Sequence, residues 1–231
     1  MIFHQLFDRA SCAFTYLLAG RGGGEACLID PVLDQVDLYL ALLAELDLSL
    51  GKAIDTHLHA DHITALGALR ERTGCDTVMG EETAAETVSQ RVRDGDRIDV
   101  DGVRLQAIHT PGHTDDSYCF VSDGKVFTGD TLLIRGTGRT DFQNGCPAEQ
   151  YDSLFNKLLK LPDHTLVYPG HDYKGETVST IGEEKLLNPR LRVDSIDDYV
   201  RLMNRLTLQR PRMMDVAVPA NLQMGLGRKA S

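Results

Sequence analysis

The sequence lacks the features that would direct the protein to a membrane or to nucleic acid. It has no block of basic residues, and 24 Lys and Arg stand against 34 Asp and Glu, which gives a formal net charge of −10. No stretch approaches the roughly 20 apolar residues that a membrane-spanning helix needs. The N-terminus has no basic segment followed by an apolar core, so no signal peptide is expected. We therefore expect a soluble cytoplasmic protein with no nucleic-acid or membrane partner.

Cysteine is scarce and is not arranged in pairs. The five cysteines are scattered and include no C-x-x-C spacing: Cys12, Cys27, Cys75, Cys119 and Cys146. An odd, scattered set of this kind argues against a disulfide scaffold and favours a reducing compartment. Cys146 lies in a loop where a thiol could be sensitive to oxidation, but a small packed side chain is the simpler interpretation.

The length of 231 residues, of which 42% are apolar, suffices for one large domain with a substantial core. We expect residues 1–231 to form a single domain, with residues 176–231 as a C-terminal extension packed on it. Periodicity predicts an α/β fold rich in strands. The predicted elements include a hairpin (Ala13–Ala19 and Ala26–Ile29), a strand (Lys52–Thr56), and helices over Asp34–Leu46, over Glu82–Val88 and from Ile63 to near Gly74. The tail from Pro211 onward has little periodicity.

Residues 56–62, with the sequence THLHADH, hold the densest set of chemically active side chains. Three imidazoles and one carboxylate fall within six residues: His57, His59, Asp61 and His62. We expect this cluster on a strand-to-helix turn, with Asp61 and His62 in the first turn of the helix. Imidazole and carboxylate are ligands for zinc, iron and manganese. A polar loop with a chance run of histidines is the alternative, and four such residues in so short a segment favour a metal site of open identity.

Three further ligand-type residues follow predicted strands in glycine-containing turns. His113 follows the strand through Ile108, Asp130 follows the strand through Phe127, and His171 follows the strand through Val167. Glycine before each of them lets the turn pack closely. Each turn alone is a weak signal, but together with the histidine cluster they predict a metal site along one edge of a sheet.

The order H-x-H-x-D-H, then His113, Asp130 and His171, resembles the metallo-β-lactamase superfamily, which implies a four-layer αββα sandwich. Two branches matter here. Glyoxalase II enzymes use the whole ligand set for two metals and hydrolyse a glutathione thioester, whereas persulfide dioxygenases use one ferrous iron and oxidise glutathione persulfide to sulfite. Four further stretches resemble the persulfide dioxygenases: Leu132–Gln143, His171–Gly175, Leu187–Arg190 and Ala217–Asn221.

This closer resemblance implies an oxidoreductase that takes glutathione persulfide and O2 and carries one Fe(II) per subunit. His57, His113 and Asp130 would be its ligands and its catalytic centre. The residues that would surround and orient these ligands without binding the iron are His59, Asp61, His62 and His171. The sequence keeps every ligand of the two-metal form, so a dinuclear zinc hydroxyacylglutathione hydrolase is the alternative function. A non-enzymatic metal-binding or redox-sensing module is a third.

Glutathione carries two carboxylates, so an acidic protein needs local cations and donors to bind it. Arg139 is the first candidate, although it could equally lock its own loop by pairing with Asp141. Tyr173 matches a glutathione-contacting tyrosine of the glyoxalase II relatives, and Arg192 and Asn221 are weaker candidates for substrate contact. The relatives also imply a homodimer.

Overall fold

The structure is a computed structural model that describes residues 1–227, and it divides into two compact units. The first unit holds residues 1–92, 97–104 and 210 onward, and the second holds residues 93–96 and 105–209. Two mixed six-stranded sheets with helices confirm the expected α/β class. The expected single domain with a C-terminal extension stays a prediction: residues 176–209 belong to the second unit and those from 210 to the first, and residues 228–231 lie outside the described part.

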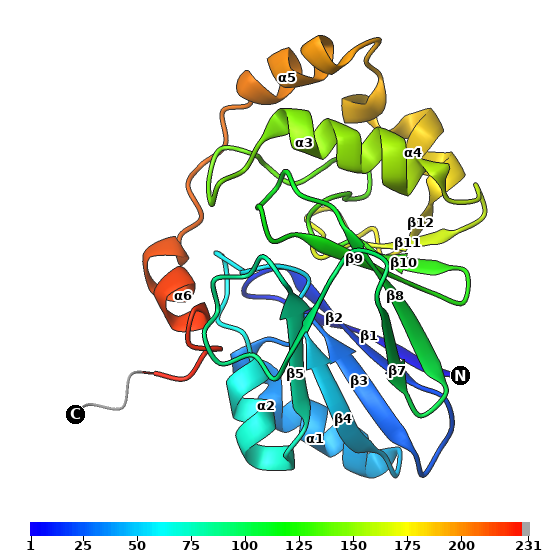
Figure 1. Ribbon diagram of the computed structural model, residues 1–231, viewed down its shortest axis with the longest axis vertical. Coiled ribbons are helices and arrows are strands. Elements are labelled where there is room, and N and C mark those ends of the chain that lie inside the picture. Colours follow the sequence, from blue (N-terminus) through cyan, green and yellow to red (C-terminus); the bar gives the residue numbers. More distant parts are fainter. Residues whose placement is uncertain (228–231) are drawn as a thin grey trace. The chain divides into compact units, whose positions relative to one another are not determined.

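The first sheet has the order β1-β2-β3-β4-β5-β6 (Figure 1). Its strands are β1 (Ile2–Asp8), β2 (Ala13–Ala19), β3 (Glu25–Ile29), β4 (Ser49–Ile54), β5 (Asp76–Gly80) and β6 (Gln90–Val92). β1, β2 and β3 pair antiparallel, and β3 to β6 run parallel. Because parallel strands end at the same edge, the residues that follow β3 and β4 are brought to one place.

α1 (Val36–Glu45), which follows the 3-10 turn η1 (Leu33–Gln35), and α2 (Leu66–Thr73) pack on this sheet. α6 (Met214–Asn221) contacts the same apolar cluster through Val218. Tyr39 and Leu43 of α1 and Leu66 and Leu69 of α2 are buried with Leu28 of β3 in one apolar cluster. Burial of these apolar side chains fixes α1 and α2 against the sheet.

The second sheet has the order β12-β11-β10-β9-β8-β7. Its strands are β7 (Arg97–Val100), β8 (Val103–His109), β9 (Tyr118–Ser122), β10 (Lys125–Phe127), β11 (Leu166–Tyr168) and β12 (Ser179–Thr180). β10 and β11 are parallel, so the turns after them leave the sheet at the same edge. Those turns carry Asp130 and His171.

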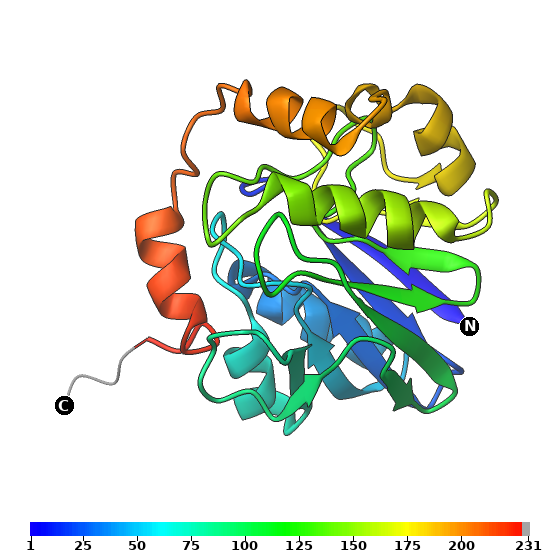
Figure 2. The same ribbon diagram turned by 45° about the horizontal axis from the view of Figure 1, so that its top comes forward.

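The helices of the second unit pack on the sheet through Leu154, Leu158, Ile181 and Tyr199, which are buried with Val167. They are α3 (Pro147–Asp152), the π turn η2 (Ser153–Lys157), the 3-10 turn η3 (Leu158–Lys160), α4 (Ile181–Leu187), the 3-10 turn η4 (Pro189–Leu191) and α5 (Ile196–Asn204). α3 and the two turns after it continue one another along the chain, and Figure 2 shows them as one long helical segment.

Local predictions are confirmed in two places. β2 and β3 form the expected hairpin, and α2 ends at Gly74 in the left-handed conformation (φ 76°). α3 begins at Pro147, and at the start of α5 the Ser195 side chain accepts a hydrogen bond from the Asp198 amide. Among residues 1–227, no helix is both long and apolar enough to cross a bilayer.

Other local predictions are wrong. Residues 82–88 are not helical, because the Arg91 guanidinium takes the carbonyls of Glu81, Thr83 and Ala85 that a helix would have used. The tail after Pro211, which showed little periodicity, contains α6 with Pro219 inside it. Neither β1 nor β6 was predicted.

Candidate metal centre

The first half of the candidate site is the histidine loop, residues 55–64, which joins β4 to α2 in the first unit. His57, His59 and His62 are almost fully buried, at 2%, 1% and 4% exposure. The His59 ring centre lies 4.2 Å from that of His57 and 4.3 Å from that of His62. Three buried imidazoles therefore face one another within a single loop.

The loop is irregular, which corrects the expectation that Asp61 and His62 begin a helix. α2 begins only at Leu66. The backbone before it is taken by tertiary bonds instead: Leu33 N donates to Ile63 O, Ala65 N donates to Pro31 O, and Thr64 bridges Val32. Helical bonds cannot form where these groups are already paired.

Asp30, at the end of β3, holds the start of the loop. It has a left-handed backbone (φ 53°) immediately before Pro31, and its carboxylate faces the end of β4. That carboxylate accepts from the Thr56 amide at 2.7 Å and from the Thr56 hydroxyl at 2.9 Å. The fixed position of Thr56 then sets the direction of the histidines that follow.

The Thr56 hydroxyl also contacts His57 Nδ1, at 2.9 Å. A carboxylate only accepts hydrogen bonds, so the single hydroxyl proton of Thr56 goes to Asp30. The hydroxyl oxygen must then accept from His57 Nδ1–H. In a neutral imidazole this leaves the lone pair on Nε2, which is the protonation state that a metal ligand requires.

His59 is held by two carboxylates. Its Nε2 lies 3.3 Å from Asp30 Oδ1 and 4.0 Å from Asp55 Oδ1, whereas the buried Nδ1 has no hydrogen-bond partner among the described residues. Burial alone would lower the pKa of His59, but the charges of Asp30 and Asp55 and the hydrogen bond to Asp30 raise it to about 9. A metal ion on Nδ1 would have to displace that proton.

Two groups of three ligand-type residues in the first unit have their ligand atoms close together. The atoms of His59, Asp61 and His62 lie within 4.8 Å of one another, and so do those of Asp30, Asp55 and His59. His62 Nδ1 lies 3.0 Å from Asp61 Oδ2, so these neighbours orient each other.

The second half of the candidate site lies in the second unit, at the ends of strands β8, β10 and β11. His113 Nε2 and Asp130 Oδ2 are 3.6 Å apart. Ligand atoms each about 2.0–2.2 Å from an ion can be no more than about 4.4 Å apart, so this pair can share one metal.

Backbone and imidazole groups orient both members of this pair. His113 Nδ1 donates to Arg139 O at 2.7 Å, because a carbonyl can only accept, and in the neutral ring this places the lone pair on Nε2. His171 Nδ1 lies 2.7 Å from Asp130 Oδ1, so Asp130 is held through one oxygen while the other faces His113. Such outer contacts set the direction and basicity of metal ligands.

Two glycines allow this close packing. A Cβ on Gly138 would lie 2.2 Å from Asp130 O and 2.7 Å from His113 Nδ1, and a Cβ on Gly170 would lie 2.8 Å from Asp130 Oδ1. Real Cβ atoms do not approach so closely. Both glycines are therefore needed for the observed positions of His113 and Asp130.

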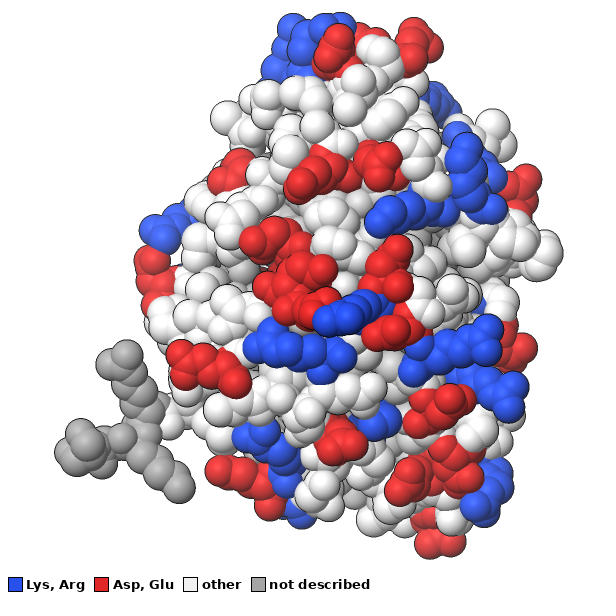
Figure 3. Space-filling view, viewed as in Figure 1, with Lys and Arg blue, Asp and Glu red and all other residues white. Residues whose placement is uncertain are grey.

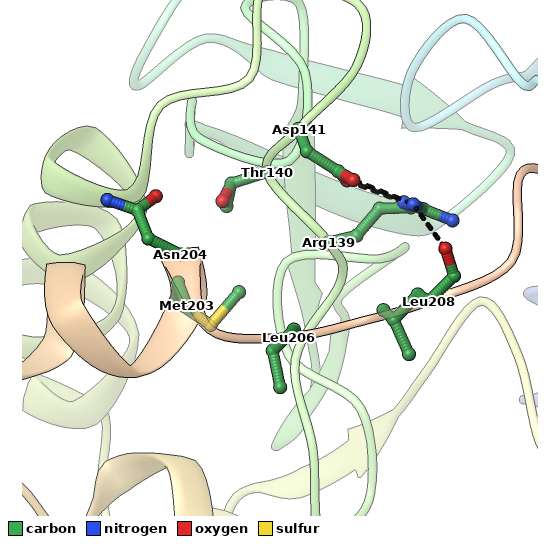
Figure 4. Close-up of a pocket in the computed structure, with 7 residues that line it drawn as sticks. All are labelled: Arg139, Thr140, Asp141, Met203, Asn204, Leu206 and Leu208. Atoms are coloured by element: carbon green, nitrogen blue, oxygen red, sulfur yellow. Dashed lines mark hydrogen bonds and ion pairs between the residues drawn. The ribbon is translucent and has the colours of Figure 1, made fainter.

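The side chain of Arg139 is fully engaged within its own unit (Figure 4). It makes a bidentate pair with Asp141 at 2.6 and 2.7 Å, donates to the carbonyls of Leu208 and Gln209, and lies 4.5 Å over the Phe142 ring. These contacts match the loop-locking alternative. The same loop borders a cavity of about 170 Å³ that is lined by Arg139, Thr140, Asp141, Met203, Asn204, Leu206 and Leu208.

The other expected substrate-contacting residues differ in exposure. Tyr173 is 69% exposed and its ring stacks on His171, with centres 5.9 Å apart. Arg192 donates to Leu186 O at 3.0 Å. Asn221 is buried, at 1% exposure, and its side-chain amide donates to carbonyls of the histidine loop.

The roles of Asp30 and Thr56 in the site were not predicted. The Asp30-Pro31 pair, which follows directly after β3, was the one sequence feature that pointed to Asp30.

The donors fit a metal ion. The lone-pair positions of His57 and His113 are fixed by hydrogen bonds to the opposite ring nitrogens, and His113 Nε2 lies 3.6 Å from Asp130 Oδ2. Neutral imidazole and carboxylate together suit iron, zinc and manganese, and two histidines with one carboxylate are typical of non-haem ferrous oxygenases.

Known proteins match nearly the whole chain. The family model of the metallo-beta-lactamase superfamily matches residues 13–171. The human and bovine proteins named "Persulfide dioxygenase ETHE1, mitochondrial" are 45% and 44% identical over 98% of this chain and 89% of theirs. A crystal structure of ETHE1 from Myxococcus xanthus has 53% identity and a TM-score of 0.96, covering 98% of this chain and all of that one.

A more distant match is the crystal structure of TTHA1623 in a di-iron-bound form. It has 27% identity and a TM-score of 0.67, and the match covers 80% of this chain and 98% of that one. These matches confirm the expected metallo-β-lactamase fold and the expected closer resemblance. The chain therefore belongs to the persulfide dioxygenase family of the metallo-beta-lactamase superfamily.

Proposed function

We propose that this protein is an iron-dependent dioxygenase that converts glutathione persulfide, O2 and water to glutathione and sulfite. The proposal is supported above all by the sequence identity of 44–45% to persulfide dioxygenases, over 98% of the chain. The reaction balances as GSSH + O2 + H2O → GSH + SO3²⁻ + 2 H⁺. The outer sulfur is oxidised and receives three oxygen atoms, two from O2 and one from water, while the S–S bond breaks and the inner sulfur leaves as the thiol.

The proposed ligands of one Fe(II) per chain are His57, His113 and Asp130. When bound, ferrous iron supplies the redox chemistry that O2 activation needs and that zinc cannot supply. The chain's own residues prepare the ligand atoms: Thr56 directs the His57 lone pair, the Arg139 carbonyl directs that of His113, and His171 holds Asp130. We propose that His59, Asp61, His62 and His171 surround the iron without binding it.

Substrate contacts are proposed at groups that can meet the carboxylates and amides of glutathione. Tyr173 is the most available, because its side chain is exposed and its ring lies against His171. Within residues 1–227, Arg192 donates to the Leu186 carbonyl alone, and a carboxylate in place of that carbonyl would make a stronger hydrogen bond. Arg139 could bind a carboxylate only by giving up part of its pair with Asp141.

Figure 3 shows acidic and basic side chains interspersed on the face drawn, with no broad basic area on its coloured part. We propose that individual donors near the site bind the anionic substrate. The homodimer, the cytoplasmic location and the absence of nucleic-acid and membrane partners stay predictions, and the mammalian relatives are named as mitochondrial proteins.

The competing function is thioester hydrolysis by two zinc ions. Identity to the persulfide dioxygenases favours the dioxygenase. All ligand-type residues for two metals are nevertheless present, and the TTHA1623 structure is of a di-iron form, so the metal count has to be measured.

Metal analysis and an oxygen electrode on freshly reduced, iron-loaded protein separate the two functions. We expect one iron per chain and one O2 consumed per sulfite formed from glutathione persulfide. S-lactoylglutathione serves as the competing substrate. Two zincs per chain, with rapid hydrolysis of S-lactoylglutathione and no O2 uptake, would exclude the dioxygenase.

A further inference from the structure

We propose that Asn221 is a positioning residue that holds the histidine loop in its metal-binding shape, so that the C-terminal segment 214–226 determines how firmly the metal is kept. The inference rests on the proposed function only in assigning a metal to this loop. It concerns a side chain that lies 157 to 162 positions along the chain from the groups it binds.

The Asn221 amide is completely used by the backbone of the loop. Its Oδ1 accepts from the Thr64 amide at 2.9 Å, and its two Nδ2 protons go to the carbonyls of His59 and His62, each at 2.9 Å. The side chain is 1% exposed, so water cannot replace it without a rearrangement. One side chain thus fixes three backbone groups that lie beside two of the buried imidazoles.

Neighbouring contacts hold Asn221 in place. Leu222 O accepts from the Glu86 amide at 3.1 Å, and Met224 O accepts from the Gly67 amide at 2.9 Å. A Cβ on Gly67 would lie 2.6 Å from Met224 O, and one on Gly225 (φ 74°) would lie 2.1 Å from Thr64 O. The segment therefore lies in direct contact with the end of the histidine loop and the start of α2.

The loop depends on this support because it has no regular structure of its own. Between β4 and α2 the backbone forms neither helix nor sheet ladder. Its beginning is fixed by Asp30 through Thr56, and its end is fixed by Asn221 through Thr64. Without Asn221 the carbonyls of His59 and His62 would turn to find other donors, and their imidazoles would turn with them.

The test is Asn221→Asp in the full-length chain, loaded with Fe(II) under anaerobic conditions. The change is nearly isosteric and keeps an acceptor for Thr64, but it removes both donors and sets a carboxylate against two carbonyl oxygens. We expect Fe(II) to be lost to a coloured chelator about 10 to 100 times more readily than from the wild type, the usual effect of losing a contact that orients a ligand. With Co(II) as the probe, the visible absorption bands should shift.

Asn188→Asp is the matched control. Asn188 is also fully buried, and its amide donates to Leu133 O, Gly136 O and Glu184 while accepting from the Arg190 amide. The substitution creates the same kind of buried carboxylate, and Glu184 beside it makes its cost in stability at least as large. We expect its Fe(II) release and Co(II) spectrum to match the wild type.

If Asn221→Asp does not fold, Gly67→Ala tests the same contact more mildly, because its Cβ displaces Met224 without altering Asn221. Faster Fe(II) release there supports the proposal. If the variant that folds releases Fe(II) at the wild-type rate, the proposal is overturned. It is also overturned if the KM for the persulfide rises while Fe(II) retention is unchanged, because that result would assign Asn221 to substrate binding. A wild type that holds iron but oxidises no persulfide would refute the proposed function alone, because the release assay measures only the metal.

Discussion

Thr56 donates its hydroxyl to the carboxylate of Asp30 across 2.9 Å, which commits its only proton. The consequence appears at His57, whose Nδ1 contacts the same hydroxyl oxygen and must be the donor there. Asp30 comes from the end of β3 and Thr56 from the loop after β4, two adjacent parallel strands. The sheet therefore selects the imidazole tautomer that can bind a metal through Nε2.

Replacement of Thr56 by Val tests this arrangement. The variant keeps the shape of the side chain but removes the acceptor for His57 Nδ1 and a hydrogen bond to a charged group, which costs about 1.5–3 kcal/mol of unfolding free energy. We expect Fe(II) affinity to fall about 10- to 100-fold. Thr77→Val in β5 is the control, since its hydroxyl is also buried but binds Ser89. Equal Fe(II) affinities of the two variants, measured by anaerobic titration, would disprove the role of Thr56.

The ligand-type residues could be found from the sequence because they form local patterns. His57 to His62 are nearly contiguous, and His113, Asp130 and His171 each follow a strand and a glycine. Strands and glycine turns are short-range features, so the hairpin β2–β3 and the helix end at Gly74 were also predictable. The second unit brings His113 and Asp130 together as the pattern predicted.

The groups that hold the ligands could not be found in this way. Asp30 and Asn221 bind backbone atoms that are 26 and up to 162 positions distant, and a backbone atom leaves no signature in the sequence. The same reason explains the errors in secondary structure. Tertiary bonds from Pro31 and Asn221 keep residues 63–65 out of a helix, and packing forms α6 despite Pro219.

The exposure of the five thiols predicts their reactivity. Cys27, Cys75 and Cys119 are buried, and burial raises the pKa of Cys27 to about 12 and also raises the pKa of Cys75. Thiolates are the reactive form, so neither of these two should react in the folded protein. We expect a maleimide reagent at neutral pH to label only Cys12 and Cys146, as mass spectrometry of the intact protein and its peptides would show. Labelling of Cys27 before unfolding would contradict the structure.

Two variants, Arg139→Ala and Asp141→Asn, show whether Arg139 stabilises its own loop or binds the substrate. If Arg139 locks the loop that carries the carbonyl bound by His113, then Arg139→Ala and Asp141→Asn should weaken Fe(II) binding to similar extents. We expect this result, measured by chelator competition, because four hydrogen bonds from Arg139 stay within the protein. If Arg139 binds a glutathione carboxylate instead, Arg139→Ala alone would raise KM, with iron content unchanged.

The Arg139–Asp141 pair also predicts a dependence of stability on pH. Hydrogen bonds from Arg139 lower the pKa of Asp141, while partial burial opposes them. A carboxyl group with a lowered folded-state pKa stabilises the protein above its unfolded pKa, about 3.9, and loses that contribution as pH falls through the folded value. The wild type should therefore exceed Asp141→Asn in unfolding free energy at pH 7, and the difference should decline below about pH 4. Urea unfolding at both ends of this range measures the difference, with Asp123→Asn, at an exposed turn, as the control. A gap between wild type and Asp141→Asn that stayed constant down to pH 2 would mean that the ionised pair contributes nothing to the stability of this loop.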